Sequence, residues 1–185
     1  DQFGGLKLSK PNVLGQFQLE NVSTAIATLR TLNLSIKDEH IKRGILKINS
    51  FARLQEIKTG KLKKLVKNNK LLIDGSHNEN GSYALNKYLQ SLDCKKHVII
   101  GMMANKEHEK YLSYFKDISS ITTIDLKTQP NSISGKKLKD KCKNIPNVQY
   151  QPSIEQAINS IDLKEGDLLL ITGSLYLAGE VLNLN

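Results

Sequence analysis

A run of polar residues, Asp74 to Asn78, directly follows the apolar residues 71–73. This pattern predicts a buried strand whose end carries ionisable side chains, and ligands bind at such strand ends in open α/β sheets. The Asp74 carboxylate could hold a hydroxyl group, a ribose or a metal-bound water. The His77 imidazole could carry a proton or orient a carboxylate. A turn that caps the next helix explains the same residues equally well, so both interpretations stay open.

Two more apolar runs end in a similar way. Residues 97–102 are followed by Lys106, and residues 167–172 are followed by Gly173 and Ser174, where a helix is expected to begin. A lysine ammonium and the free N–H groups of a helix N-terminus both attract anions. The alternatives are a solvated surface lysine for Lys106 and an ordinary helix N-cap for Ser174.

Arginine occurs at only three positions of this lysine-rich chain, Arg30, Arg43 and Arg53. Arg53 comes just before the first strand expected in the main domain. Its planar guanidinium suits the two-pronged binding of a phosphate or a carboxylate, and a surface salt bridge is the alternative. Asn21 stands near the start of an expected helix, where a simple cap is the alternative.

Several common signatures are missing from the sequence. There is no G-x-G-x-x-G after a strand and no G-x-x-x-x-G-K-[ST], so we expect no phosphate-binding loop in this chain. Cys94 and Cys142 lack the spacing of a metal site and suit a reducing compartment, which favours a cytoplasmic protein. We expect no metal site in this chain.

The composition favours a folded domain. Of the 185 residues, 39% are hydrophobic, and no apolar run approaches the roughly 18 residues of a membrane helix. The net charge of +9 comes from lysines that are not interleaved with aromatic residues, which argues for a solvated surface and against nucleic-acid binding. The start has no signal-peptide pattern and no initiator Met, so we expect a piece of a longer chain.

Apolar periodicity predicts two parts. One helix is expected from about residue 20 and another over residues 35–48, with a domain boundary near residues 49–52. The expected strands are residues 54–57, 62–66, 70–74, 97–102, 121–125, 148–150 and 167–172, and helices are expected around residues 85–92, 106–116, 132–143, 154–161 and 174–182. This alternation predicts an α/β fold with a Rossmann-like, mostly parallel sheet and helices on both faces.

Taken together, the motifs resemble the C-terminal part of folylpolyglutamate synthase and dihydrofolate synthase, members of the Mur ligase superfamily. The segments that carry the resemblance are GQFQLENVSTA at 15–25, FARLQ at 51–55, DGSHNE at 74–79, GMMANKE at 101–107 and GSLY at 173–176. The sequence departs from the family pattern at Phe17, where His is usual, at Phe51-Ala52, where Pro-Gly is usual, and at Glu79, where Pro is usual.

The resemblance implies an ATP-dependent ligase that adds L-glutamate to a folate or dihydropteroate carboxylate through an acyl phosphate. It implies that residues 1–48 are the helical tail of an ATPase domain and that residues 49–185 form the C-terminal glutamate ligase domain. The phosphate-binding loop and the Mg²⁺ ligands would lie in the N-terminal half of the family's enzymes, so this chain alone is expected to be inactive. The N-terminal ATPase domain would be its partner.

The family motifs also imply roles for single residues. Asn21, Arg53 and Asp74 would contact ATP. His77 and Ser174 would help to bind glutamate, and His77 and Lys106 would act on the reacting groups. Two alternatives remain open: the C-terminal domain of a peptidoglycan Mur ligase, and a non-catalytic Rossmann-like module that binds nucleotides.

Overall fold

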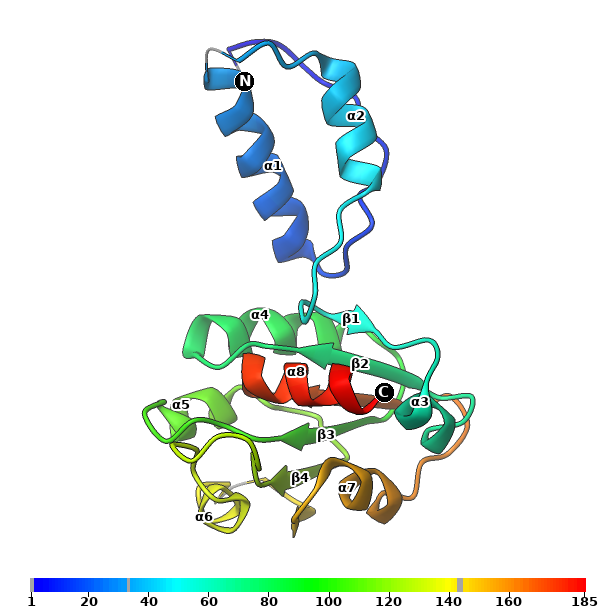
Figure 1. The fold of residues 1–185 in the computed structure, drawn as a ribbon, viewed down its shortest axis with the longest axis vertical. Coiled ribbons are helices and arrows are strands. Elements are labelled where there is room, and N and C mark those ends of the chain that lie inside the picture. Colours follow the sequence, from blue (N-terminus) through cyan, green and yellow to red (C-terminus); the bar gives the residue numbers. More distant parts are fainter. Residues whose placement is uncertain (1, 33, 143–144) are drawn as a thin grey trace. The chain divides into compact units, whose positions relative to one another are not determined.

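The computed structural model describes residues 2–32, 34–142 and 145–185, and its contacts divide the chain into two units, residues 1–51 and 52–185 (Figure 1). The N-terminal unit contains α1 (Gln16–Thr31) and α2 (Asp38–Leu46). Both helices begin at positions other than those expected. The backbone at Gly15 has a φ of 86°, which starts α1 early and places Asn21 inside the helix instead of at its start.

The expected Ser35 cap of α2 is also wrong. The helix starts at Asp38, and two acidic residues occupy its first turn, where the positive end of the helix dipole stabilises them.

The C-terminal unit is built on one six-stranded sheet with the order β1-β2-β6-β3-β4-β5. All neighbouring strands run parallel except β1, which pairs antiparallel with β2. The strands are β1 (Gln55–Glu56), β2 (Lys70–Asp74), β3 (Lys96–Ile100), β4 (Ser120–Ile124), β5 (Val148–Gln151) and β6 (Leu168–Thr172). This sheet confirms the mostly parallel α/β fold expected from the sequence.

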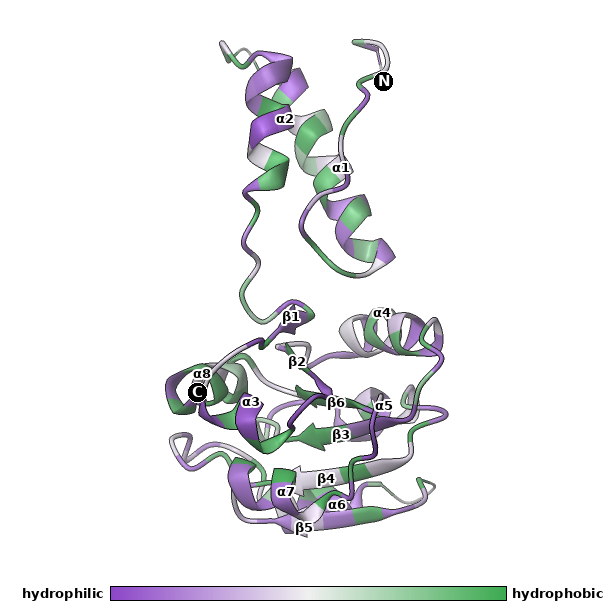
Figure 2. Ribbon diagram, turned by 90° about the vertical axis from the view of Figure 1, so that its right-hand side faces the viewer, coloured by the Kyte–Doolittle hydropathy of each residue, from purple (hydrophilic) through white to green (hydrophobic). Residues whose placement is uncertain are grey.

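Helices cover both faces of the sheet. The helices are α3 (Lys61–Leu65), α4 (Glu79–Gln90), α5 (His108–Ser113), α6 (Gly135–Asp140), α7 (Ile154–Ser160) and α8 (Leu175–Leu184). Figure 2 shows α3 and α8 on one side of the sheet and α4 and α5 on the other, and α7 packs with α3. Of the described helices, none is both long and apolar enough to cross a membrane.

The core follows from the alternation of side chains along the strands. Leu71 and Ile73 of β2 point into the cluster under α3, α7 and α8, together with Leu169 and Ile171 of β6. Neighbouring strands end at the same level, since Thr172 pairs with Asp74 on one side and with Ile100 on the other. The loops that follow β2, β6 and β3 therefore leave the sheet side by side.

One expected strand is a helix. The sequence pattern predicts a strand over residues 62–66, but residues 61–65 form α3. Leu62 in this helix and Val66 directly after it are both buried, one helical turn apart. The end of the chain stabilises this helix, because the Asn185 side chain accepts hydrogen bonds from the backbone N–H groups of Leu62 (3.1 Å) and Lys63 (3.3 Å). The helices expected over residues 106–116 and 132–143 also form, as the shorter α5 and α6.

Candidate functional site

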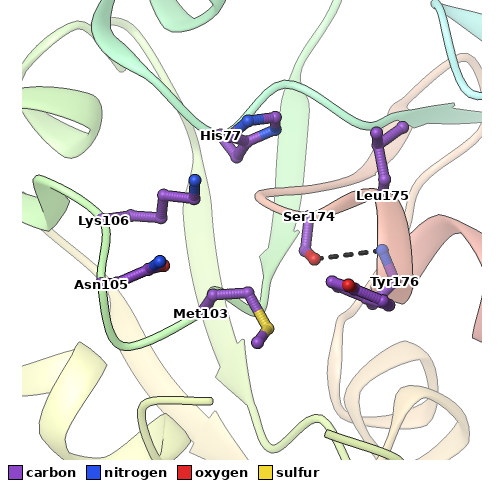
Figure 3. Close-up of a pocket in the computed structure, with 7 residues that line it drawn as sticks. All are labelled: His77, Met103, Asn105, Lys106, Ser174, Leu175 and Tyr176. Atoms are coloured by element: carbon purple, nitrogen blue, oxygen red, sulfur yellow. Dashed lines mark hydrogen bonds between the residues drawn. The ribbon is translucent and has the colours of Figure 1, made fainter. Parts of the chain in front are cut away.

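The loops after β2, β3 and β6 enclose a pocket of about 230 Å³ (Figure 3). It brings together three of the residues singled out in the sequence: His77 from the first loop, Lys106 from the second and Ser174 from the third. The full lining is His77, Met103, Asn105, Lys106, Ser174, Leu175 and Tyr176. Within the part of the chain that the structure describes, no lining residue is acidic, and the lining includes the Lys106 ammonium.

His77 is half-buried, and its own loop fixes its orientation. The Nδ1 atom lies 2.9 Å from the Gly75 carbonyl oxygen. A carbonyl can only accept, so Nδ1 must carry a hydrogen in either protonation state. In the neutral ring, Nε2 is then the acceptor that remains for a ligand.

Lys106 belongs to a loop that is held at several points. The Nε2 of His108 lies 3.0 Å from the Met103 carbonyl oxygen, and the backbone N–H of Ala104 donates to the Asn131 carbonyl at 3.0 Å. Figure 3 shows the Lys106 side chain extending toward His77 and the middle of the pocket. No ion pair of Lys106 occurs among the described residues, so its charge is available for an anion.

Ser174 caps the helix that closes the other side of the pocket. It is buried, and its Oγ accepts a hydrogen bond from the Tyr176 backbone N–H at 3.1 Å. Ser174 is therefore the N-cap of α8, as one of the two interpretations of the sequence expects. Gly173 before it has a φ of 108°, and a Cβ there would lie 2.7 Å from the Gly101 carbonyl oxygen. Only glycine allows this close approach of the two loops.

Arg53 projects from a strained loop beside the end of β2. Its neighbours Ala52 and Leu54 both have positive φ values, 53° and 51°, which cost backbone energy in residues with side chains. Three hydrogen bonds hold this conformation. The Ala52 carbonyl accepts from the Gly75 N–H (2.7 Å), the Leu54 N–H donates to Asp74 Oδ2 (2.8 Å) and the Ala52 N–H donates to Gln55 Oε1 (2.9 Å).

Asp74 is buried and is only 3% exposed. Its Oδ1 accepts from the Ser76 N–H at 2.8 Å, while its Oδ2 accepts from Leu54. Burial raises the pKa of the Asp74 carboxyl, and this effect outweighs the opposing effects of the Ser76 and Leu54 hydrogen bonds and of the Arg53 charge. These residues also form the turn that caps the next helix, as the alternative interpretation of the segment expects. Asn78 caps α4 by accepting a hydrogen bond from the Gly81 N–H at 2.9 Å.

Asn21 and Arg53 are not among the residues that line the pocket. Asn21 lies on α1 of the N-terminal unit, where its Nδ2 donates to Gln18 Oε1 at 3.2 Å. Among the described residues, there is no cluster of three or more His, Cys, Asp or Glu side chains that could hold a metal ion.

Four lining residues were given no role in the sequence analysis, although they lie in the segments 101–107 and 173–176 that carry the resemblance: Met103, Asn105, Leu175 and Tyr176. Leu175 and Tyr176 are about half exposed, at 49% and 54%, although both follow a buried strand and open an apolar helix. Exposed large side chains at the start of α8 could have been a signal, but the sequence alone does not separate them from core residues of that helix.

Residues 53–175 match the family of the Mur ligase glutamate ligase domain, so the chain belongs to this family. Its curated relatives include a UDP-N-acetylmuramoyl-L-alanyl-D-glutamate--2,6-diaminopimelate ligase of Buchnera aphidicola, which is 30% identical over 92% of this chain and 34% of the relative. They also include the dihydrofolate synthase/folylpolyglutamate synthase of Bacillus subtilis, which is 22% identical over 93% of this chain and 40% of the relative. The chain thus spans 34% to 40% of these two proteins.

Solved structures share the fold. E. coli FolC in complex with DHPP and ADP aligns with a TM-score of 0.80 at 23% identity, over 95% of this chain and 40% of FolC. Mycobacterium tuberculosis folylpolyglutamate synthase complexed with ADP and AMPPCP aligns with a TM-score of 0.80 at 18% identity, over 94% of this chain and 41% of that enzyme. The resemblance noted in the sequence is confirmed at the level of the family and the fold.

Proposed function

We propose that this chain is the C-terminal part of an ATP-dependent ligase that adds L-glutamate to a folate or dihydropteroate carboxylate. The observation that carries the proposal is the pocket at the ends of β2, β3 and β6. It offers a lysine ammonium, an imidazole and a helix N-terminus, and none of the described residues that line it has a carboxylate. Such a donor set favours a substrate with negative charges.

In this proposal, the amino-acid substrate occupies the pocket. Lys106 and the N-terminus of α8, which Ser174 caps, bind its carboxylates. The Nε2 of His77 faces its amino group and accepts a hydrogen bond or a proton, because Nδ1 is already committed to Gly75. Holding the amine in one orientation is the main contribution of the pocket to amide formation.

ATP is the proposed cosubstrate, and bound ATP would supply the phosphoryl group that activates the acceptor carboxylate. The exposed guanidinium of Arg53 fits a phosphate group, since the strained Ala52 and Leu54 conformations fix the backbone on both sides of it. We propose that Asp74 acts in nucleotide binding through the Leu54 backbone that it holds. Asn21 stays a proposed ATP contact, and any Mg²⁺ ligands are expected in the part of the enzyme that this chain does not include.

The proposed partner is the ATPase part of the same ligase. The N-terminal unit leaves several large apolar side chains exposed, which suits a surface completed by further protein: Phe3, Leu32, Leu34, Ile36, Leu46 and Phe51. We assign residues 1–48 to the tail of that ATPase domain and residues 49–185 to the ligase domain. The free Cys94 and Cys142 suit a reducing compartment, so we place the complete enzyme in the cytoplasm.

The test compares the 185-residue chain with the complete ligase that includes the ATPase part. Each is incubated with ATP, Mg²⁺, dihydropteroate or a folate, and L-glutamate, and the amide product is measured by mass spectrometry. We expect product only from the complete ligase. Product formed by the 185 residues alone, or none from the complete ligase, would overturn the proposal.

The pocket is tested by Lys106→Gln in the complete ligase, with Lys110→Gln as the matched control. Lys110 is exposed and pairs with Glu107 at 2.7 Å. Lys106→Gln should raise the KM for glutamate by about tenfold or more, and the control should leave it unchanged. Equal KM values in the two variants would return Lys106 to the solvated-surface interpretation.

A second candidate function is favoured by the 30% identity to the diaminopimelate ligase of Buchnera. Diaminopimelate carries a second ammonium group, and a carboxylate would be expected to receive it. The lining of the pocket has none among the described residues, which favours glutamate. Supplying the complete ligase with each amino acid and with each acceptor in turn decides between the two ligase functions. Binding of ATP without any amide product would instead support the non-catalytic module that binds nucleotides.

A further inference from the structure

Three hydroxyl groups form a buried ring behind the pocket. The Tyr111 hydroxyl lies 2.8 Å from Thr172 Oγ1 and 3.2 Å from Ser76 Oγ, and these two oxygens lie 3.4 Å apart. Tyr111 and Thr172 have no exposed surface, and Ser76 is 5% exposed. Each group comes from a different element: α5, the end of β6 and the loop after β2.

The ring satisfies all of its members. Each hydroxyl can donate once and accept at the same time, so a cycle from Tyr111 to Thr172 to Ser76 and back leaves no hydrogen without an acceptor. Burial raises the pKa of the Tyr111 phenol, so it keeps its proton at neutral pH. The short Tyr111–Thr172 bond ties α5 to the end of β6, and the longer contacts of Ser76 connect the loop after β2 to both.

The ring members are next to the residues that line the pocket. Ser76 precedes His77, and Thr172 lies two residues before Ser174. The main chain of Tyr111 adds two more connections. Its carbonyl accepts from Ser82 Oγ of α4 at 2.5 Å, and its N–H donates at 3.0 Å to the carbonyl of Glu107, the residue after Lys106.

We propose that Tyr111 is a positioning residue of the candidate site: its hydroxyl joins the loops that carry His77 and Ser174, and its main chain joins them to the loop of Lys106. Seven described residues line the pocket and Tyr111 is not one of them, so it acts through its neighbours. The role in ligation rests on the proposed function, whereas the role in holding the loops does not.

The first experiment measures kinetics of the complete ligase with Tyr111→Phe, which keeps the aromatic ring and removes the hydroxyl. The matched control is Tyr114→Phe. It also removes a hydroxyl near the end of α5, one that donates to Glu79 at 2.8 Å outside the pocket. Tyr111→Phe should raise the KM for the amino acid and lower kcat/KM by about 10- to 100-fold, while the KM for ATP stays within about twofold. The control should leave all three values unchanged.

Thr172→Val breaks the same ring of hydroxyls from β6 and serves as the second variant if Tyr111→Phe does not fold. It should give the same pattern of kinetic constants. A parallel change in the KM values for ATP and the amino acid, or no change in either, would overturn the positioning role.

The second experiment uses hydrogen exchange and needs no activity. In the 185-residue chain, Tyr111→Phe should speed exchange at residues 75–77, 101–106 and 173–176 together, and Tyr114→Phe should not. Unchanged exchange in these loops overturns the inference whether or not the ligase is active. If the wild-type complete ligase forms no amide, the proposed function fails and the exchange data still decide the role of Tyr111.

Discussion

Asp74 joins two loops, because each of its carboxylate oxygens accepts a hydrogen bond from a backbone N–H group. Asp74→Asn replaces one acceptor by an NH₂ group and leaves one buried N–H without a partner. We expect the free energy of unfolding to fall by about 1–3 kcal/mol, measured by urea denaturation followed by circular dichroism. The matched variant Asp140→Asn, at an exposed position on α6, should change it little.

The same pair of proteins, wild type and Asp74→Asn, should respond differently to pH. The pKa of folded Asp74 is raised above its usual value of 3.8, mainly by burial. The folded state therefore binds this proton more tightly than the unfolded state does. The resulting stability is fully present below pH 3.8 and is lost as the pH rises through the pKa of folded Asp74. The difference in unfolding free energy should grow as pH falls from neutral toward about 4. A difference that shrinks over this range would contradict the pKa direction.

Arginine and lysine are not equivalent at the exposed position 53, where we propose that Arg53 binds a phosphate group. Lysine keeps the charge but loses the planar, two-pronged set of donors. In the complete ligase, Arg53→Lys should reduce the transition-state stabilisation, measured from kcat/KM for ATP, by about 2–3 kcal/mol. The melting temperature should stay unchanged. Arg43→Lys on α2 is the exposed control. Normal kinetics in both variants would leave Arg53 as a surface residue.

At the scale of elements, two glycines near or within α8 give opposite predictions. Gly173→Ala places a Cβ against Gly101 at a φ of 108°, so it should destabilise the fold by about 1–3 kcal/mol. Gly179 lies inside α8, and a Cβ added there would meet no atom within 4 Å, so Gly179→Ala should stabilise by roughly 0.5–1 kcal/mol. Thermal unfolding of both variants measures the sign, and a stable Gly173→Ala would argue against the close packing of these loops.

The central strands β2, β3 and β6 could be predicted from the sequence because each contains a run of apolar residues. Buried parallel strands such as β2 and β6 leave this signal, and their polar ends proved to face one pocket, as with His77 and Ser174. Segment 62–66 was ambiguous, because a run of this length fits a strand or a helix. Its helix depends on a cap from Asn185, and no local pattern reveals a partner so far along the chain.

The ring of hydroxyls could not be predicted either. Tyr111 looks like any apolar residue of a helix face, and Ser76 and Thr172 look like ordinary turn and strand residues. Only the register of β2 and β6, together with the Tyr111 side chain that reaches them from α5, brings the three hydroxyls together. The roles assigned to Asn21, Arg53, Asp74, His77, Lys106 and Ser174 remain predictions. The variants at Arg53 and Lys106 test the roles of those two residues.

At the scale of the whole chain, the two units differ in how they bury apolar surface. The large core cluster draws all its members from residues 52–181, whereas Ile41 and Ile45 are the buried hydrophobic residues in the described part of the N-terminal unit. A unit with so little buried apolar surface gains little stability on its own. We therefore expect the ligase domain to fold without residues 1–51, and residues 1–51 to need further protein to become stable.

Removal of residues 1–51 tests this expectation. The remaining residues 52–185 should melt within about 3 °C of the 185-residue chain, because the core cluster is intact. Limited proteolysis of the 185-residue chain should cleave first within residues 1–51 and leave a resistant fragment whose mass corresponds to about residues 52–185. In the complete ligase, the ATPase part should slow that cleavage. A much lower melting temperature for the truncated protein would mean that the N-terminal unit contributes to the ligase-domain core.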